Sequence, residues 1–342
     1  MINILFTCAG RRNYLINYFK DALGDDGQTI ALDMDETAPA LADADISIKA
    51  PSIYDNKYIK FLIDIIDKYN INALISLNDL ELPILSKNID KLSINNIKII
   101  VSDENVIKKS FDKFETAKFL KNINLNTPLT FNSITKVKSA LIENKVKFPL
   151  VVKPRWGSCS INVDFVNDEY ELDLVYMLQK IRLKNTILSE VSKDSPDNAI
   201  LIQEKINGVE YGMDVLNDFS GNYYSSFSRK KLLMRSGETD KAVSVINKEL
   251  LSIGETIGKK LKHLGNLDCD VFFDGKKYYV LELNPRFGGG YPFSHEAGIN
   301  TCAIYIEWIK GNKNIDRFNN YKENIIFSKC DRMLNIKNRL NE

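Results

Sequence analysis

The segment Tyr278–Gly290 constrains the fold and the chemistry of this chain more than any other part of its sequence. It starts with alternating β-forming residues, which puts Glu282 and Asn284 on one face of a strand and apolar residues on the other. Pro285 has no N–H group and ends the strand, and Arg286 follows directly. Carboxylate and amide oxygens suit Mg²⁺, and arginine suits a phosphate or a developing anion. The segment therefore predicts a strand ending at a site for phosphate and a metal ion, the alternative being a polar surface turn.

Length and charge limit the classes of protein to which this chain can belong. Its 342 residues allow two or three domains, and its 46 lysines and arginines nearly balance its 45 aspartates and glutamates. No basic block stands out, so we expect no nucleic-acid partner. The five cysteines are scattered without a CxxC pair, which favours reduced thiols over a disulfide framework. Because no apolar run approaches the roughly 18 residues of a membrane span, and the first is too short for a signal peptide, we expect a soluble, cytoplasmic protein.

Strands alternate with amphipathic helices through the first part of the chain. The predicted strands cover residues 2–8, 29–33, 73–77 and 97–102, and the predicted helices cover residues 11–23 and 58–69. A further helical stretch is predicted at residues 103–120. This alternation predicts a parallel sheet of the Rossmann-like type, and ligands of such sheets bind beyond the carboxyl ends of the strands. We therefore expect ligand-binding residues among the strand ends at 7–12, 33–35 and 78–81.

A dinucleotide site is one alternative for this first part. Gly10 after one strand and Asp33 after the next have the right order, but the fingerprint G-x-G-x-x-G needs three glycines and the chain offers one there. Arg11 and Arg12 also stand where a pyrophosphate would need bare backbone. We therefore expect no NAD(P). Two arginines beside a helix N-terminus suit a carboxylate or phosphate of a smaller ligand, with solvated surface arginines as the alternative.

A phosphate-binding segment is predicted at residues 148–160. A hydrophobic strand there delivers Lys153 into a loop of small residues. Backbone and hydroxyl donors beside a point cation can hold a phosphate. The segment is not a Walker A loop, because G-x-x-x-x-G-K-[ST] is absent, and an exposed strand-end lysine is the alternative.

A hairpin is predicted where the turn at residues 274–275, Asp-Gly, joins the strand 266–273 to the strand that begins at Tyr278. This hairpin would place Asp270 on the strand next to the one that carries Glu282. Two carboxylates and Asn284 would then meet on adjacent strands, as a Mg·nucleotide site requires. His263, in a predicted helix, is expected to be packed or solvated rather than catalytic.

Together these segments resemble the ATP-grasp superfamily, and in particular short proteins similar to one half of the carbamoyl-phosphate synthetase large subunit. The resemblance runs from Ile2 to about Tyr305, and its most specific motif is Glu282-Leu-Asn-Pro-Arg286 followed by Phe-Gly-Gly-Gly. Further matching motifs are Pro-Leu-Val-Val-Lys153-Pro, Gln-Glu204-Lys-Ile-Asn-Gly-Val-Glu210-Tyr, Phe-Thr-Cys-Ala-Gly10-Arg11-Arg12 and Asn78-Asp79-Leu-Glu81-Leu. The resemblance implies an α/β chain in which two α+β lobes close on ATP behind a Rossmann-like, parallel-sheet first domain. The implied domains are residues 1–104 for the first domain, 105–205 for the N-terminal lobe with the lid and phosphate loop, and 206–342 for the C-terminal lobe with the metal and catalytic site.

The resemblance also implies a role for each matching position. Arg286 would be catalytic and would stabilise an acyl phosphate and a tetrahedral intermediate. The residues implied to bind ATP are Lys113, Lys153, Ser158, Ser160, Glu204, Lys205, Ile206 and Glu210. The residues implied to hold one or two Mg²⁺ ions, or Mn²⁺, are Asp270, Glu282 and Asn284. The residues expected to touch substrate are Arg11, Arg12 and Gly289. The loop at 155–162 has fewer glycines than the family usually shows, which leaves open how tightly the lid closes.

The expected function is that of an ATP-dependent ligase that joins a small-molecule carboxylate to an amine or a thiol. ATP would phosphorylate the carboxylate, and the nucleophile would then expel phosphate from the acyl phosphate. Catalysis would consist of positioning and charge neutralisation, because no general base stands out. Two alternatives stay open: a kinase or carbamoyl-phosphate-forming enzyme, and a non-catalytic nucleotide-sensing subunit. A homodimer is also left open.

Overall fold

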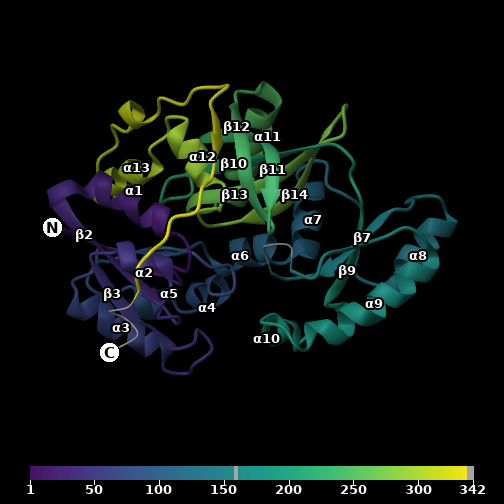
Figure 1. Cartoon of the computed structure of the whole chain (residues 1–342), viewed down its shortest axis with the longest axis horizontal. Helices are drawn as coiled ribbons and strands as arrows, with labels where there is room; N and C mark the ends of the chain where they lie inside the picture. Colours follow the sequence, from purple (N-terminus) through teal and green to yellow (C-terminus); the bar gives the residue numbers. More distant parts are fainter. Residues whose placement is uncertain (158–160, 337–342) are drawn as a thin grey trace.

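The computed structural model describes residues 1–157 and 161–336, which form three sheets with their helices. Figure 1 shows a first domain at the lower left, a small lobe at the right and a large lobe between and above them. The mixture of one parallel and two antiparallel sheets confirms the predicted α/β fold with a parallel-sheet first domain. Among the residues described, none of the helices combines the length and the apolar character that a membrane crossing needs.

The first domain is a five-stranded parallel sheet in the order β3-β2-β1-β4-β5. Its strands are β1 (Ile2–Thr7), β2 (Gly27–Asp33), β3 (Ile46–Lys49), β4 (Ala73–Ser76) and β5 (Lys98–Ile100). Its helices are α1 (Asn13–Leu23), η1 (Gly24–Asp26), α2 (Pro39–Asp43), α3 (Tyr58–Lys68), α4 (Leu82–Ser86) and α5 (Ile89–Leu92). The sequence interpretation missed β3, a short edge strand whose outer side chains are exposed.

The small lobe is a four-stranded antiparallel sheet in the order β6-β9-β7-β8. Its strands are β6 (Thr130–Phe131), β7 (Leu150–Pro154), β8 (Asp164–Val166) and β9 (Ile200–Glu204). Its helices are α8 (Ile134–Ile142), α9 (Glu169–Leu183), α10 (Ser189–Ser192) and η2 (Pro196–Asn198). One core of its own holds this lobe together, and Leu80 of the first domain packs against that core.

The large lobe is a six-stranded antiparallel sheet in the order β14-β13-β10-β11-β12-β15. Its strands are β10 (Val209–Asn217), β11 (Tyr223–Arg235), β12 (Glu238–Val245), β13 (Gly265–Phe273), β14 (Tyr278–Asn284) and β15 (Ile326–Ser328). Its helices are α11 (Lys248–Leu261), α12 (Tyr291–Glu296), α13 (Thr301–Ile309) and η3 (Asp316–Phe318). The predicted hairpin at residues 274–275 is confirmed as β13–β14.

The predicted single helical stretch at 103–120 is wrong, because the chain breaks at Asp112 into α6 (Glu104–Phe111) and α7 (Lys113–Asn122). The Asp112 carboxylate accepts the N–H groups of Phe114 (3.0 Å) and Glu115 (3.3 Å), which makes it the N-cap of α7. Both helices contribute to the core of the large lobe. Lys113 therefore becomes the first residue of a helix packed beside β14.

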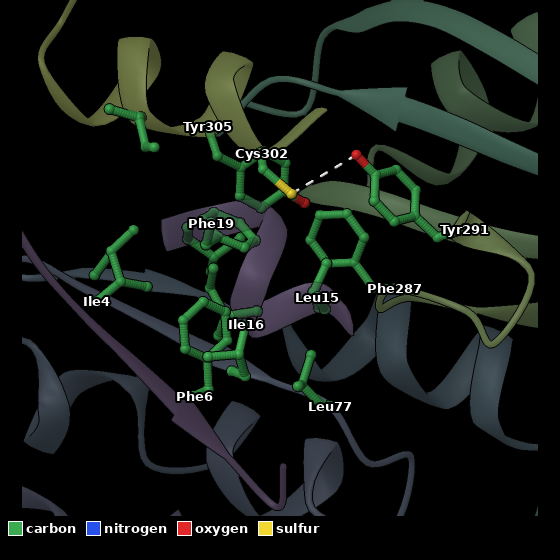
Figure 2. Packing of buried hydrophobic residues seen from close by; sticks show 14 of the residues in the cluster. Ile4, Phe6, Leu15, Ile16, Phe19, Leu77, Phe287, Tyr291, Cys302 and Tyr305 are labelled. Atoms are coloured by element: carbon green, nitrogen blue, oxygen red, sulfur yellow. Dashed lines mark hydrogen bonds between the residues drawn. The ribbon is translucent and has the colours of Figure 1, made fainter. Parts of the chain in front are cut away.

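A shared aromatic core joins the first domain to the large lobe (Figure 2). Phe19 of α1 lies with its ring centroid 6.0 Å from those of both Phe287 and Tyr305. Phe287 in turn lies 4.8 Å from Tyr291 on α12. Because buried aromatic side chains contribute large apolar areas, this core fixes how the two parts dock. The docking sets the carboxyl ends of β1 and β4 beside the residues that follow β14.

Candidate active site

The β13–β14 hairpin gathers the acidic and amide side chains that the sequence indicated. Its register pairs Asp270 with Glu282, and Asp268 with Asn284. Positions two apart on a strand share a face, and all four residues line one cavity of about 60 Å³. The local sequence explains the arrangement, because the turn at residues 274–275 connects two alternating strands.

This cavity, called here the hairpin cavity, collects side chains from the first domain and the large lobe. Its lining residues are Arg12, Arg229, Lys231, Met234, Gly237, Glu238, Thr239, Asp268, Asp270, Glu282, Asn284, Arg286, Gly289 and Gly290. The predicted site residues among them are Arg12, Asp270, Glu282, Asn284, Arg286 and Gly289. The charged residues that sequence reasoning missed are Arg229, Lys231, Glu238 and Asp268.

Lys231, on β11, links two of the predicted site residues. Its Nζ atom donates to Oε1 of Glu210 and to Oδ1 of Asp270, each at 2.6 Å. Burial opposes the charge on Lys231, but the two carboxylates outweigh it and raise its pKa above the usual value. A sequence signal for this residue exists: Arg229 and Lys231 alternate along β11 as Asp268 and Asp270 do along β13.

Two further lysines reach Glu282 from outside the hairpin. The Nζ atoms of Lys153, on β7, and of Lys113, on α7, lie 3.7 Å and 3.9 Å from Oε1 of Glu282. Lys113 also donates to the carbonyl oxygen of Gly157. Burial lowers the pKa of Lys153 to about 8, and the neighbouring Glu282 carboxylate opposes this shift. The structure thus brings together the two lysines predicted to bind phosphate.

Arg286 is buried between carboxylates of two different domains. Its Nη2 atom donates to Oδ2 of Asp79, in the first domain, at 2.5 Å. Its Nη1 atom donates to the carbonyl oxygen of Phe287 (3.1 Å) and lies 3.7 Å from Oδ2 of Asp268. The sequence predicts ligand-binding residues at the strand end 78–81, but no local pattern connects this segment to Arg286.

Arg229 supplies a second buried guanidinium beside Arg286. It donates to Oδ2 of Asp214 at 2.5 Å and to Oδ1 of Asp268 at 2.9 Å. The backbones of Gly212 and Gly290 enclose it, and a Cβ atom at either position would overlap the guanidinium. Burial opposes the charge on Arg229, but Asp214 and Asp268 raise its pKa above the usual value. Asp268 therefore lies between two arginines that are fixed in place.

The residues predicted to bind adenine lie at the end of β9. The backbone N–H of Glu204 donates to the carbonyl oxygen of Leu129 (2.8 Å), and the Leu129 N–H donates to Oε2 of Glu204 (3.1 Å). Glu204 and Lys205 line a separate cavity of about 300 Å³, and Ile206 follows them in the chain. The segment that enters the small lobe at Leu129 and the segment that leaves it at Glu204 are thus hydrogen-bonded to each other.

Three predicted site residues remain, namely Ser158, Ser160 and Arg11. Ser158 and Ser160 lie outside the described residues. Arg11 is exposed and does not line the cavity. Its neighbour Arg12 does, and Nη1 of Arg12 donates to the hydroxyl of Tyr14 at 3.0 Å.

The predicted metal ligands have the chemistry that Mg²⁺ requires. Over residues 1–157 and 161–336 there is no group of three or more His, Cys, Asp and Glu side chains arranged to hold a metal ion. The predicted set instead consists of two carboxylates, Asp270 and Glu282, and the amide of Asn284. These oxygens fit a magnesium ion that takes its remaining ligands from phosphate groups and water. The donor set therefore suits a metal that arrives with a nucleotide.

Comparison with known families shows to which protein family this chain belongs. A family model described as an ATP-grasp domain matches residues 110–290, more than half of the chain. The chain belongs to the ATP-grasp family. A second model, described as a PylC-like N-terminal domain, matches residues 4–100 of this ATP-grasp chain. The resemblance drawn from the motifs is confirmed.

Relatives and solved structures agree with this membership. The carbamoyl phosphate synthase large chain of Thermoanaerobacter sp. (strain X514) is 26% identical over 239 residues, covering 64% of the ATP-grasp chain and 20% of that relative. The chain thus spans about a fifth of the length of such relatives. The biotin carboxylase of Campylobacter jejuni superposes with a TM-score of 0.71 at 17% identity, over 95% of this chain and 74% of that one. The L-amino acid ligase of Bacillus licheniformis gives a TM-score of 0.64 at 19% identity, over 91% and 74%. At these identities the structural likeness shows the ATP-grasp fold.

Proposed function

We propose that this ATP-grasp chain is a ligase that joins a carboxylate to an amine or a thiol through an acyl phosphate, forming ADP and phosphate from ATP. One observation carries the proposal: Asp270, Glu282 and Asn284 share the hairpin cavity with Arg286. Lys153 reaches Glu282 at the same place. The names of the relatives, a carbamoyl phosphate synthase, a biotin carboxylase and an L-amino acid ligase, support a ligation reaction.

The residues divide into groups that bind ATP and groups that act on the reacting atoms. Asp270, Glu282 and Asn284 would hold Mg²⁺, which supplies positive charge to the phosphate oxygens. Lys113 and Lys153 would contact the same phosphates as point charges. The residues proposed for the phosphate loop, adenine and ribose are Ser158, Ser160, Glu204, Lys205, Ile206 and Glu210. Because Glu210 is bonded to Lys231, a ribose hydroxyl would join that pair rather than an isolated carboxylate.

The reaction would proceed in two displacements. First, a carboxylate oxygen of the substrate attacks the γ-phosphorus of ATP, the bond to the bridging oxygen breaks, and ADP leaves. Second, the amine or thiol attacks the acyl carbon, loses its proton, and expels phosphate. Arg286 would stabilise the negative charge that develops on the acyl phosphate and on the tetrahedral oxygen. The protein would contribute positioning and charge neutralisation rather than a covalent intermediate of its own.

An isotope experiment tests the acyl phosphate directly. The purified chain is screened for ADP release with Mg·ATP, small carboxylates, and amines or thiols, singly and in pairs. The active carboxylate is then supplied with ¹⁸O in its carboxyl group. We expect one ¹⁸O atom to appear in the released phosphate, because the acyl phosphate leaves with an oxygen of the acid. ADP release without ¹⁸O transfer would overturn the proposal.

The same screen separates the alternative functions. A ligase releases ADP continuously only when both co-substrates are present. A kinase, or an enzyme that stops at an acyl phosphate, needs one phosphate acceptor. A non-catalytic nucleotide-sensing subunit releases no ADP under any of these conditions. The Glu282→Gln variant serves as the control, because it removes the carboxylate charge while keeping the shape of the side chain.

A further inference from the structure

The loop that follows β4 in the first domain connects three parts of the molecule. Asp79 is paired with Arg286 across 207 positions of sequence. Leu80 packs against the core of the small lobe. Glu81 is fully buried in the first domain itself. Three successive side chains of one loop therefore contact the large lobe, the small lobe and the first domain.

Glu81 fixes this loop in position. Its carboxylate accepts the hydroxyl groups of Thr7 (2.6 Å) and Ser76 (2.5 Å), and also that of Tyr58. The loop is further closed by the N–H of Leu80, which donates to Oδ1 of Asn78 at 2.9 Å. A carboxylate that accepts three hydroxyl groups in a buried site restricts its backbone to one conformation. Asp79 is thus presented from a rigid support.

The Asp79–Arg286 pair is itself buried, at 5% and 8% exposure. On its other side the guanidinium faces Asp268, with Nη1 3.7 Å from Oδ2. An arginine side chain has several rotatable bonds, and a planar guanidinium must face its target in a defined plane. Asp79 at Nη2 and Asp268 near Nη1 set that plane before any substrate arrives.

We propose that Asp79 is a positioning residue for Arg286, so that the first domain contributes to the active site. Asp79 holds the guanidinium in the orientation in which it meets the acyl phosphate and the tetrahedral oxygen. This inference rests on the proposed function, since it assumes that Arg286 acts on those groups. Preorganised donors need no reorientation in the transition state, so losing Asp79 lowers rate more than nucleotide affinity.

The test compares Asp79→Asn with a matched control. The amide keeps the size of the side chain and removes its charge. We expect kcat to fall at least about tenfold while KM for ATP changes by less than about threefold. The control is Asp26→Asn, which removes another ion pair between the first domain and the large lobe, Asp26–Lys310 at 2.9 Å. Neither of those residues lines the hairpin cavity, and we expect kcat to stay unchanged.

A double-mutant cycle shows whether Asp79 acts through Arg286. In an Arg286→Ala background, Asp79→Asn should lower kcat no further. The inference is overturned if Asp79→Asn leaves kcat unchanged, lowers it equally in both backgrounds, or changes kcat and Tm in parallel with Asp26→Asn. If Asp79→Asn does not fold, Asp79→Glu, which keeps the charge but shifts it by a methylene group, takes its place in the same cycle. An Arg286→Ala variant with normal kcat would instead refute the proposed function.

Discussion

The Nζ atom of Lys153, on β7, lies 3.7 Å from Oε1 of Glu282, on β14, so a cation of the small lobe meets a carboxylate of the large lobe. Both side chains have a proposed role in binding Mg·ATP, the lysine toward phosphate and the carboxylate toward the metal. In the structure they neutralise each other. A nucleotide with its metal would supply a separate partner to each, so binding would exchange one contact between the lobes for two contacts through the ligand.

Glu282→Gln should lower turnover by about 10²-fold or more, because it removes the charge proposed to bind the metal, which also faces two lysines. The fold should persist, since the side chain keeps its size and its place on β14. Steady-state ADP release and thermal unfolding check the two expectations. Glu255→Gln is the control, since Glu255 forms an exposed pair with Lys259 at 2.6 Å on α11. Normal turnover in Glu282→Gln would rule out the assigned metal site.

Arg286→Ala should lower kcat by about 10²-fold or more while the Kd for Mg·ATP shifts by less than about tenfold. The reason is that Arg286 follows the proposed metal ligands, where charge would develop, whereas the residues proposed to bind adenine lie at the end of β9. Arg286→Lys should recover little, because a point charge cannot hold both Asp79 and the substrate in one plane. Calorimetry of nucleotide binding beside turnover measures both quantities. Loss of ATP binding with normal turnover at saturation would make Arg286 a nucleotide-binding residue.

Lys231→Met should reduce the free energy of unfolding by about 2 kcal/mol, since it leaves two partly buried carboxylates, Glu210 and Asp270, facing each other. Without the positive charge of Lys231, the two carboxylates should also attract cations more strongly. We therefore expect added Mg²⁺ to raise the Tm of the variant more than that of the wild type. Lys259→Met, which breaks the exposed pair with Glu255, should cost less than about 1 kcal/mol and show no such difference. An equal Mg²⁺ effect on all three proteins would contradict the expectation.

His263 should make the protein less stable as the pH falls from about 6.5 to about 4. It is fully buried, its Nε2 atom lies 3.0 Å from the carbonyl oxygen of Val215, and burial lowers its pKa to about 4. The unfolded chain binds a proton near its ordinary pKa of about 6.5, whereas the folded protein does not until about pH 4. Protonation therefore favours unfolding in that range, by up to about 3 kcal/mol. In His263→Gln this contribution is absent, so the stability difference from wild type should shrink below pH 6.5. A difference that stays constant between pH 8 and pH 4.5 would show that His263 has the same pKa in the folded and the unfolded chain.

The sequence by itself determined the local elements of this site. The hairpin of β13 and β14 follows from alternation and from a short turn at residues 274–277, both of which act over a few neighbouring positions. That was enough to place Asp270 opposite Glu282 and to put Asn284 on the same face. The positions of Lys153 at a strand end and of Arg286 after a proline likewise follow from neighbouring residues. The spacing of apolar residues did not predict the break at Asp112. That spacing continues across the break, whereas the capping side chain of Asp112 starts a new helix there.

Only the tertiary structure decided which distant groups meet these residues. Lys231 reaches Asp270 across 39 positions because β10, beside both β11 and β13, carries Glu210 between them. Asp79 reaches Arg286 across 207 positions because the aromatic core around Phe19 docks the first domain on the large lobe. Strand order and domain docking depend on the packing of whole faces, which no short window of sequence contains. The carboxylates and cations of the site could therefore be listed from the sequence, while their pairing required the fold.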